Sequence, residues 1–405
     1  MNKAYFKTLV LSASAIIIAI SIIIYPKETY MASVNGLKMW WDVVFPSLMP
    51  FFILSEVLMG FGVVHLIGVL FEPLMRPLFR VPGAGGFVWA MGISSGFPAG
   101  AKLTARLWHQ KQITTLEAER LVSFTNCSNP LFMFSAIAVG FFHNAALGIV
   151  LAVSHYVGNI FVGLIMRFHG WKKEPVNKEV RYRGKGLTNA FKHMHEARLA
   201  DNRPIGQLLG DAVQQSTKTL LMIGGFIILF SVLSKMMDLL HVAQLLSNFI
   251  NYLFIMLSLS EQLSLPLIKG IFEITLGSNL TSLAQSPILQ QAVIVSFILA
   301  FSGFSVQAQV ASILADTDIK FKPFFFARIL HGFLSAIICL LVFPYLYHVK
   351  STTAPAFAFL TEKTVHISEF GMLALMHSHY VTLGFLMISI LLWNRSLMKK
   401  NSLRT

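Results

Sequence analysis

The sequence has 405 residues, of which 55% are hydrophobic and only 12% are charged. Soluble domains carry about 25% charged residues, so this chain has too few charges to cover a soluble surface of its size. The net charge of +14 is typical of some nucleic-acid-binding proteins, but the Lys and Arg residues fall mainly in loops between apolar runs. That distribution is a signal of membrane topology. We therefore predict an integral membrane protein with no nucleic-acid partner.

At the N-terminus, Lys3 and Lys7 precede an apolar run from Leu9 to Tyr25. No clear small-x-small cleavage site follows this run, which favours a retained signal anchor over a cleaved signal peptide. The two cysteines, Cys127 and Cys339, lie far apart inside apolar stretches and are expected to be free thiols.

Apolar segments long enough to cross a bilayer follow one another along the chain. They cover residues 9 to 25, 47 to 70, 121 to 142, 145 to 166, 219 to 240, 288 to 315, 324 to 347 and 371 to 393. Gly and Pro interrupt two shorter apolar pieces, 83 to 106 and 265 to 287, which is typical of re-entrant hairpins. Residues 71 to 80 and 242 to 259 are candidates for helices at the membrane interface. The predicted fold class is an all-α polytopic membrane protein with about eight transmembrane helices and two re-entrant hairpins.

A cytoplasmic N-terminus places about 26 of the Lys and Arg residues inside and about 6 outside, in agreement with the positive-inside rule. The loop from Arg167 to Lys218 holds the largest basic cluster and is interpreted as a solvated cytoplasmic linker.

The sequence also shows an internal repeat. An offset of about 178 residues places the span 47 to 70 over 219 to 240, and 145 to 166 over 324 to 347. The predicted topology makes the two units inverted repeats. The predicted domains are an N-terminal signal-anchor helix (1–30), a first repeat (31–167), a basic cytoplasmic linker (168–218), a second, inverted repeat (219–348), and a C-terminal helix with a basic tail (349–405).

Inverted repeats with broken apolar segments at matching places indicate a secondary transporter, because unpaired backbone groups within a membrane are tolerated only around a cavity. In the first hairpin, Gly96 and Pro98 can break a helix, and an anion could bind at the helix N-terminus so formed. The candidate solute-binding residues here are Ser94, Ser95 and Gly96. An alternative is that Gly92, Gly96 and Gly100 form a small-xxx-small packing face.

The second hairpin contains the ionisable residue Glu273, whose burial in a membrane is costly and usually functional. It is a candidate for binding a proton, a cation or the solute, together with Thr275, Ser278 and Asn279. The alternative is a structural glutamate paired with Lys269, four residues earlier.

Two polar breaks interrupt apolar spans: the first polar break, residues 123–130, and the second polar break, residues 302–309. Their hydroxyls and amides can bind a polar solute, although such side chains also hold transmembrane helices together. The candidates in these breaks are Thr125, Asn126, Ser128, Asn129, Ser302, Gly303, Ser305 and Gln307. Lys102 follows the first hairpin and is a further candidate for attracting an anion. Glu56 and His155 are single polar groups in spans, as compatible with structural as with functional roles.

Other chemistry is not supported by the sequence. Residues 92–96 match the G-x-S-x-G nucleophile elbow, but no preceding strand, acid or base is evident, so no enzyme is predicted. His193 and His195 lie in the basic loop with no further ligand pattern, so no metal is predicted. No phosphate-binding loop is present, and no cofactor is expected.

At the first hairpin and both breaks the chain resembles the nucleoside-recognition, or Gate, domain family and, more distantly, the concentrative nucleoside transporters. Within that group it resembles the YlbJ-type sporulation integral membrane proteins over nearly its whole length. The stretches that carry the resemblance are Gly96 to Lys102, Thr125 to Pro130 and Ser302 to Phe304.

The comparison with the nucleoside transporters also shows differences. Glu273 matches the glutamate of their second hairpin, and Gly303 with Phe304 matches their Gly-Phe. The glutamate of their first hairpin is missing here, and Val306 stands in place of their asparagine. Because the missing groups are ones that would hold base and ribose, the resemblance argues against a nucleoside as the substrate.

The resemblance to the YlbJ type implies a role in endospore formation: export of dipicolinic acid from the mother cell across the outer forespore membrane. Serines, asparagines, hairpin N-termini and Lys102 suit this small planar dianion. A nucleoside or cation carrier of the same fold, and a membrane scaffold that recruits partners through its basic loop, are the alternatives. Membrane lipids are the expected surroundings, and a homo-oligomer is compatible with the sequence.

Overall fold

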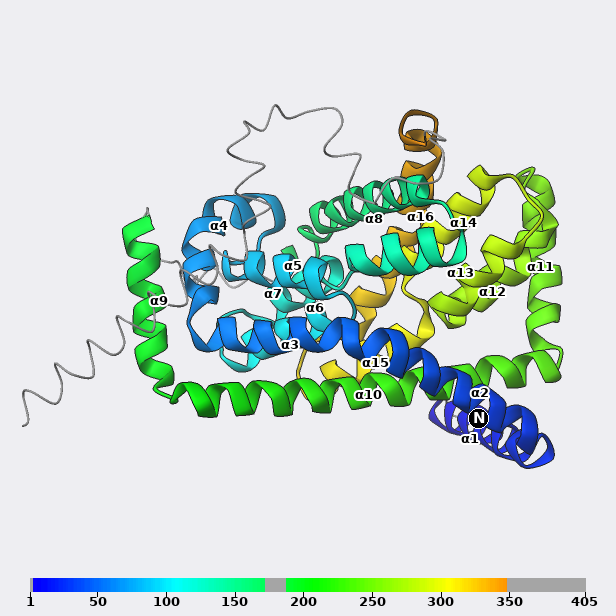
Figure 1. The fold of residues 1–405 in the computed structure, drawn as a ribbon, viewed down its shortest axis with the longest axis horizontal. Coiled ribbons are helices and arrows are strands. Elements are labelled where there is room, and N and C mark those ends of the chain that lie inside the picture. The colour runs from blue at the N-terminus through cyan, green and yellow to red at the C-terminus, as the bar shows by residue number, and fades with distance from the viewer. Residues whose placement is uncertain (1–2, 172–186, 348–405) are drawn as a thin grey trace, which may run out of the picture. The chain divides into compact units, whose positions relative to one another are not determined.

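The computed structural model describes residues 3–171 and 187–347, which belong to one compact unit, and every regular element among them is helical (Figure 1). The first half contains α1 (Lys3–Ile24), α2 (Pro26–Met39), α3 (Phe45–Gly60), α4 (Val63–Phe79), α5 (Ala84–Ser95), α6 (Ala99–His109), α7 (Thr115–Thr125), the π-helical η2 (Phe132–Phe141) and α8 (Ala145–Met166). The second contains α9 (Leu187–Asp201), α10 (Ile205–Leu239), α11 (Val242–Met256), α12 (Ser264–Phe272), α13 (Ile274–Leu283), α14 (Ile288–Phe301), α15 (Gly303–Leu314) and α16 (Phe321–Leu346).

Among the described residues, five helical segments are long and apolar enough to cross a membrane, and a bent pair, α3 with α4, makes a sixth candidate. The five are Tyr5–Ile24, Ala145–Met166, Ile205–Leu239, Ile288–Leu314 and Phe321–Leu346. Together with the all-helical structure, these segments confirm the predicted class of all-α polytopic membrane protein. The predicted span 371 to 393 and the C-terminal region 349–405 lie outside the described residues.

Two predicted segments, the span at 47 to 70 and the linker at 168–218, differ from the structure. The span predicted at 47 to 70 is two helices bent by 84°, because Gly62 adopts the left-handed conformation with φ of 76°. The span at 121 to 142 is interrupted after Thr125, where the Asn126 to Asn129 stretch leaves the helix at the predicted first polar break. The linker predicted at 168–218 contains α9, which packs on α4, and the first turns of α10.

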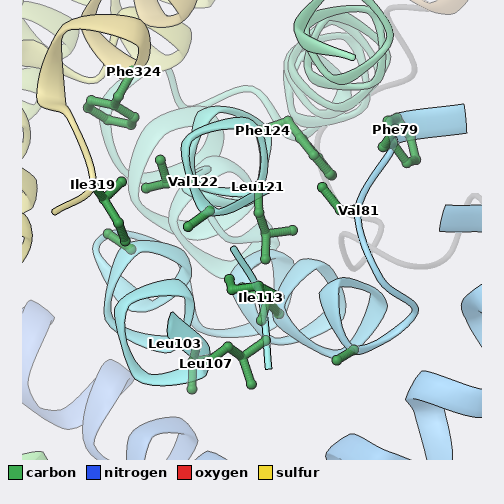
Figure 2. Close-up of a cluster of buried hydrophobic side chains, with 14 of the residues drawn as sticks. Phe79, Val81, Leu103, Leu107, Ile113, Leu121, Val122, Phe124, Ile319 and Phe324 are labelled. Carbon is green, nitrogen blue, oxygen red and sulfur yellow. The ribbon is translucent and has the colours of Figure 1, made fainter. Parts of the chain in front are cut away.

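The helices of the first half pack around a core that also takes side chains from the second half. Phe79, Leu121 and Phe124 are fully buried there beside Ile319 and Phe324, which come from the chain around the start of α16 (Figure 2). Helix α16 packs against both α8 and α14, so the two halves share one interior. Cys127 and Cys339 are buried free thiols, as predicted.

Two sets of helices follow the same order in the two halves. In each half, one helix (α4 or α11) leads to a hairpin (α5 and α6, or α12 and α13). A broken pair of helices follows (α7 and η2, or α14 and α15), and then a long helix (α8 or α16). The contacts are reciprocal, since α15 packs on α6 as η2 packs on α13, and α16 packs on α7 as α14 packs on α8. The domain boundaries and the inverted orientation in a membrane stay predictions.

Helices α2 and α3 run along the long helix α10, shown in green in Figure 1. The Trp40 indole donates a hydrogen bond to the backbone oxygen of Leu220 at 2.9 Å. The ring also covers Gly224, where a Cβ atom would lie 2.7 Å from Trp40 Cε2. The neighbouring Gly225 has nothing within 4 Å of such a Cβ atom. Only the first of these two glycines is therefore required for close packing.

This pair offers a matched test of the contact between Trp40, which directly follows α2, and helix α10. We expect Gly224→Leu to lower the free energy of unfolding by about 2 kcal/mol, because the added side chain must displace the Trp40 ring. Gly225→Leu should have little effect, and thermal unfolding of the two purified variants measures the difference. Equal unfolding midpoints for the two variants would contradict the packing described here.

Candidate functional site

One cavity brings together the tips of both hairpins and parts of both polar breaks. Its empty volume is about 670 Å³, part of it open to the surroundings. The polar residues and the glycine that line it are Ser95, Gly96, Ser128, Asn129, Glu273, Thr275, Ser305 and Gln309. Its apolar wall comes from Met39, Val44, Leu48, Phe97, Phe132, Ile223, Ile227, Ile274 and Val306. Helix α10 and the α2–α3 region thus close one side with aliphatic side chains.

The first hairpin enters the cavity through the turn between α5 and α6. Helix α5 ends at Ser95, and Gly96 follows with φ of 81°, a conformation that suits glycine. Asn129 fastens this turn, because its amide nitrogen donates to the Ser95 backbone oxygen at 3.0 Å while its Oδ1 accepts from the Phe132 backbone N–H at 2.7 Å. The first hairpin and the first polar break are therefore joined at the cavity wall.

The other glycines of this hairpin have a packing role. A Cβ atom on Gly92 or on Gly100 would collide with the backbone oxygen of Thr125. Both legs of the hairpin thus approach the end of α7 so closely that only hydrogen fits. The two alternatives considered for this hairpin apply to different residues: Gly96 lines the cavity, whereas Gly92 and Gly100 form the packing face.

The second hairpin enters the cavity through Glu273, which lies between α12 and α13. Its carboxylate accepts hydrogen bonds from the Leu276 backbone N–H at 2.8 Å and from the Thr275 hydroxyl at 2.7 Å. Glu273 is thus the N-cap of α13, and the protein's own carboxylate fills the anion-binding end of this helix. The structure does not form the alternative pair with Lys269, whose ammonium instead contacts Asp238 and the Ser234 backbone oxygen on α10.

The first polar break is held by side chains from two other helices. Arg328 of α16 donates to the backbone oxygens of Ser123 and, at 2.9 Å, Asn126. His155 of α8 accepts from the Ser128 backbone N–H at 3.1 Å, which gives this residue a structural role. We did not single out Arg328 from the sequence. The available signal was a charged residue inside the predicted span 324 to 347.

The second polar break turns at Ser302 and Gly303, whose φ values are 69° and 57°. The amide nitrogen of Gln307 donates to the Phe301 backbone oxygen at 3.0 Å and so caps α14. Ser305 lines the cavity, and Gln309, one helical turn later, does so too. Sequence reasoning missed Gln309, although its spacing of four residues from Ser305 places both on one helix face.

The remaining predicted residues do not line the cavity. Ser94 and Asn279 are exposed. Lys102 pairs with Glu56 at 3.2 Å, and Glu56 also contacts Arg106, so this lysine is not available as an isolated charge. The others are buried without lining the cavity and are Thr125, Asn126, Ser278, Ser302, Gly303 and Gln307.

Several polar atoms in the cavity wall, the breaks and the second hairpin have no hydrogen-bond partner among the described residues. The hydroxyls of Ser95 and Ser128 belong to the wall itself. Others in the breaks and the second hairpin are both side-chain polar atoms of Asn126, the hydroxyls of Ser278 and Ser302, and Oε1 of Gln307. Buried polar groups are usually paired, so these unpaired ones are available to bind water or a polar solute.

Comparison with known proteins gives two matches. The Gate family model, described as "Nucleoside recognition", matches residues 41–167, which run from η1 (Trp40–Val44) to the end of α8. The chain is 54% identical over 348 residues to the sporulation integral membrane protein YlbJ of Bacillus subtilis (strain 168), covering 86% of this chain and 85% of that protein. No solved structure matches the chain.

Proposed function

The chain belongs to the family of the sporulation integral membrane protein YlbJ, and on this basis we propose that it is a secondary transporter or facilitator of a small anionic metabolite. The Gate match over residues 41–167 contains the first hairpin and the first polar break, two of the places where the chain resembles this family. The proposed role is transport rather than catalysis, and it requires no cofactor.

The observation that carries this proposal is the shared cavity. Both hairpin tips and both polar breaks contribute to its wall, although those of the first half are separated from those of the second by more than a hundred residues in the sequence. Helix ends and unpaired hydroxyls inside a membrane protein are costly unless they face a solute or water path. The reciprocal packing of the two halves supports a mechanism in which they move against each other around this cavity.

We propose dipicolinate as the solute, moved from the mother cell across the outer forespore membrane. Ser95, Ser128 and the amide of Gln309 offer hydrogen-bond donors for carboxylate oxygens. Phe97 and Phe132 supply apolar surface for a planar ring. The proposed partners are the solute and the surrounding lipids, and no nucleic acid is among them. The proposal does not depend on a homo-oligomer.

A nucleoside carrier is the second candidate, and one specific observation favours it. Glu273 lies in the cavity wall, where a carboxylate can accept hydrogen bonds from ribose hydroxyls. Uptake into proteoliposomes separates the two functions. We expect radiolabelled dipicolinate, and not uridine, to accumulate in vesicles that contain the protein. Uptake of uridine alone would replace the first candidate by the second.

The site itself is tested by two neighbouring serines. Ser95 is buried in the cavity wall and Ser94 is exposed, with its hydroxyl bonded to the Ala90 backbone oxygen. We expect Ser95→Leu to reduce dipicolinate uptake by about tenfold or more, because an apolar side chain removes a donor and fills the cavity. Ser94→Leu should transport normally at equal protein levels. Normal uptake by both variants would refute the assignment of the cavity as the solute site.

A further inference from the structure

Arg328 is a fully buried guanidinium for which the structure provides no carboxylate. Its donors contact the backbone oxygens of Ser123 and Asn126 and, at 3.5 Å, Oδ1 of Asn159. No Asp or Glu among the described residues pairs with it. Buried arginines are usually paired with acids, so this one requires an explanation.

Other basic side chains near the hairpins show the usual arrangement. Lys102 pairs with Glu56, and Lys269 pairs with Asp238. These pairs tie α6 to α3 and α12 to α10, and each gives the lysine a carboxylate partner, which in the case of Glu56 is shared with Arg106. Arg328 differs because neutral carbonyl and amide oxygens are its acceptors.

Those carbonyls belong to the end of α7, where the last turn of a helix leaves its oxygens without intrahelical partners. A helix C-terminus carries only a partial negative charge of about half an elementary charge. It therefore stabilises the guanidinium without neutralising its full charge. A net positive charge remains buried next to the first polar break.

This charge lies close to the cavity. Asn126, which accepts from Arg328, precedes the wall residue Ser128 by two positions, and two residues of chain span at most about 7 Å. Ser128 is fixed in turn, because its backbone N–H donates to His155 and its backbone oxygen accepts from the Tyr156 hydroxyl at 3.0 Å. The geometry of this wall thus depends on side chains from α8 and α16.

Another part of the cavity wall has a different charge. There the carboxylate of Glu273 forms part of the wall, and the neighbouring end of α14 is capped by the neutral amide of Gln307. The cavity is therefore positive on the side of the first polar break and negative on the side of the second hairpin.

We infer that Arg328 is a positioning and selectivity residue: it fixes the first polar break and directs the anionic group of a solute toward Ser95 and Ser128, away from Glu273. This inference rests on the proposed function and adds to it the source of anion preference. Arg328 acts through the break and its electric field rather than by direct contact with the solute.

Binding of a matched pair of ligands to the purified full-length protein tests this inference. Dipicolinate is a dianion, and pyridine-2,6-dicarboxamide has the same shape without charge. The readout is the dissociation constant of each ligand, taken from the concentration dependence of the thermal unfolding midpoint.

We expect Arg328→Gln to weaken binding of dipicolinate about tenfold and binding of the diamide much less. Arg328→Lys should keep the preference for the dianion. Lys320→Gln removes an exposed charge just before α16 and should behave as wild type.

The possible outcomes are distinct. Equal weakening of both ligands by Arg328→Gln would make Arg328 purely structural and overturn the inference. If Arg328→Gln does not fold, a folded Arg328→Lys variant that has lost the preference for dipicolinate would overturn it as well. A wild-type protein that binds neither ligand would refute the proposed substrate, and the inference with it. That failure is visible before any variant is made.

Discussion

Gly100→Ala is expected to destabilise the protein by about 3 kcal/mol or to prevent its folding. The added Cβ atom would lie 2.7 Å from the backbone nitrogen of Asn126 and closer still to the carbonyl group of Thr125. These are backbone atoms at the end of α7, and Arg328 already holds this region in place. The clash cannot be relieved by rotating a side chain. Thermal unfolding in detergent, followed by circular dichroism, measures the effect.

The matched control is Gly210→Ala near the start of α10, where nothing lies within 4 Å of the added atom. This variant should be neutral or more stable by up to about 1 kcal/mol, because alanine favours a helix over glycine. Similar unfolding midpoints for the two variants would mean that the hairpin and α7 do not pack as closely as described.

Glu273→Gln is expected to tighten dipicolinate binding about tenfold. The carboxylate of Glu273 places a negative charge in the wall of a cavity that we propose accepts an anion, and the amide removes that charge. The amide oxygen can still accept from the Leu276 N–H, so the N-cap of α13 is kept. Isothermal titration of the purified protein with dipicolinate measures the change.

Glu261→Gln is the control, since Glu261 is an exposed glutamate in the same half of the chain, and its variant should bind as wild type does. Weaker dipicolinate binding by Glu273→Gln would show that the carboxylate helps to hold the solute. That result would contradict the proposal that the charge of Glu273 opposes an anionic solute. Glu273→Ala also removes the cap and should cost about 1 kcal/mol of stability.

Much of the membrane architecture could be predicted because its signal is local. Runs of apolar residues, and the Gly, Pro and polar residues that interrupt them, indicated the all-helical class, the hairpins and both breaks. The bend at Gly62 was missed because the residues on both sides of it are apolar. A hydropathy pattern does not distinguish a straight span from two helices bent by 84°.

The candidate site was predicted in part, and Lys269 shows why the rest was not. A spacing of four residues predicts a pair with Glu273 on one helix face. Glu273 instead has φ of −146° and ψ of 122°, so the helix ends before it and the spacing no longer brings the two side chains together. The lysine contacts Asp238 of α10, whose position depends on how the helices pack.

The sequence by itself determined that this chain spans a membrane, where its helices are interrupted, and which polar residues are candidates for a solute path. These properties follow from residue type and local order, because a bilayer excludes charge and irregular backbone is costly within it. Only the tertiary structure decided that Ser95 rather than Ser94 faces the cavity, and that Arg328 holds a break two hundred residues earlier. Such contacts join distant segments, and the packing of α16 against α7 and α8 sets their geometry.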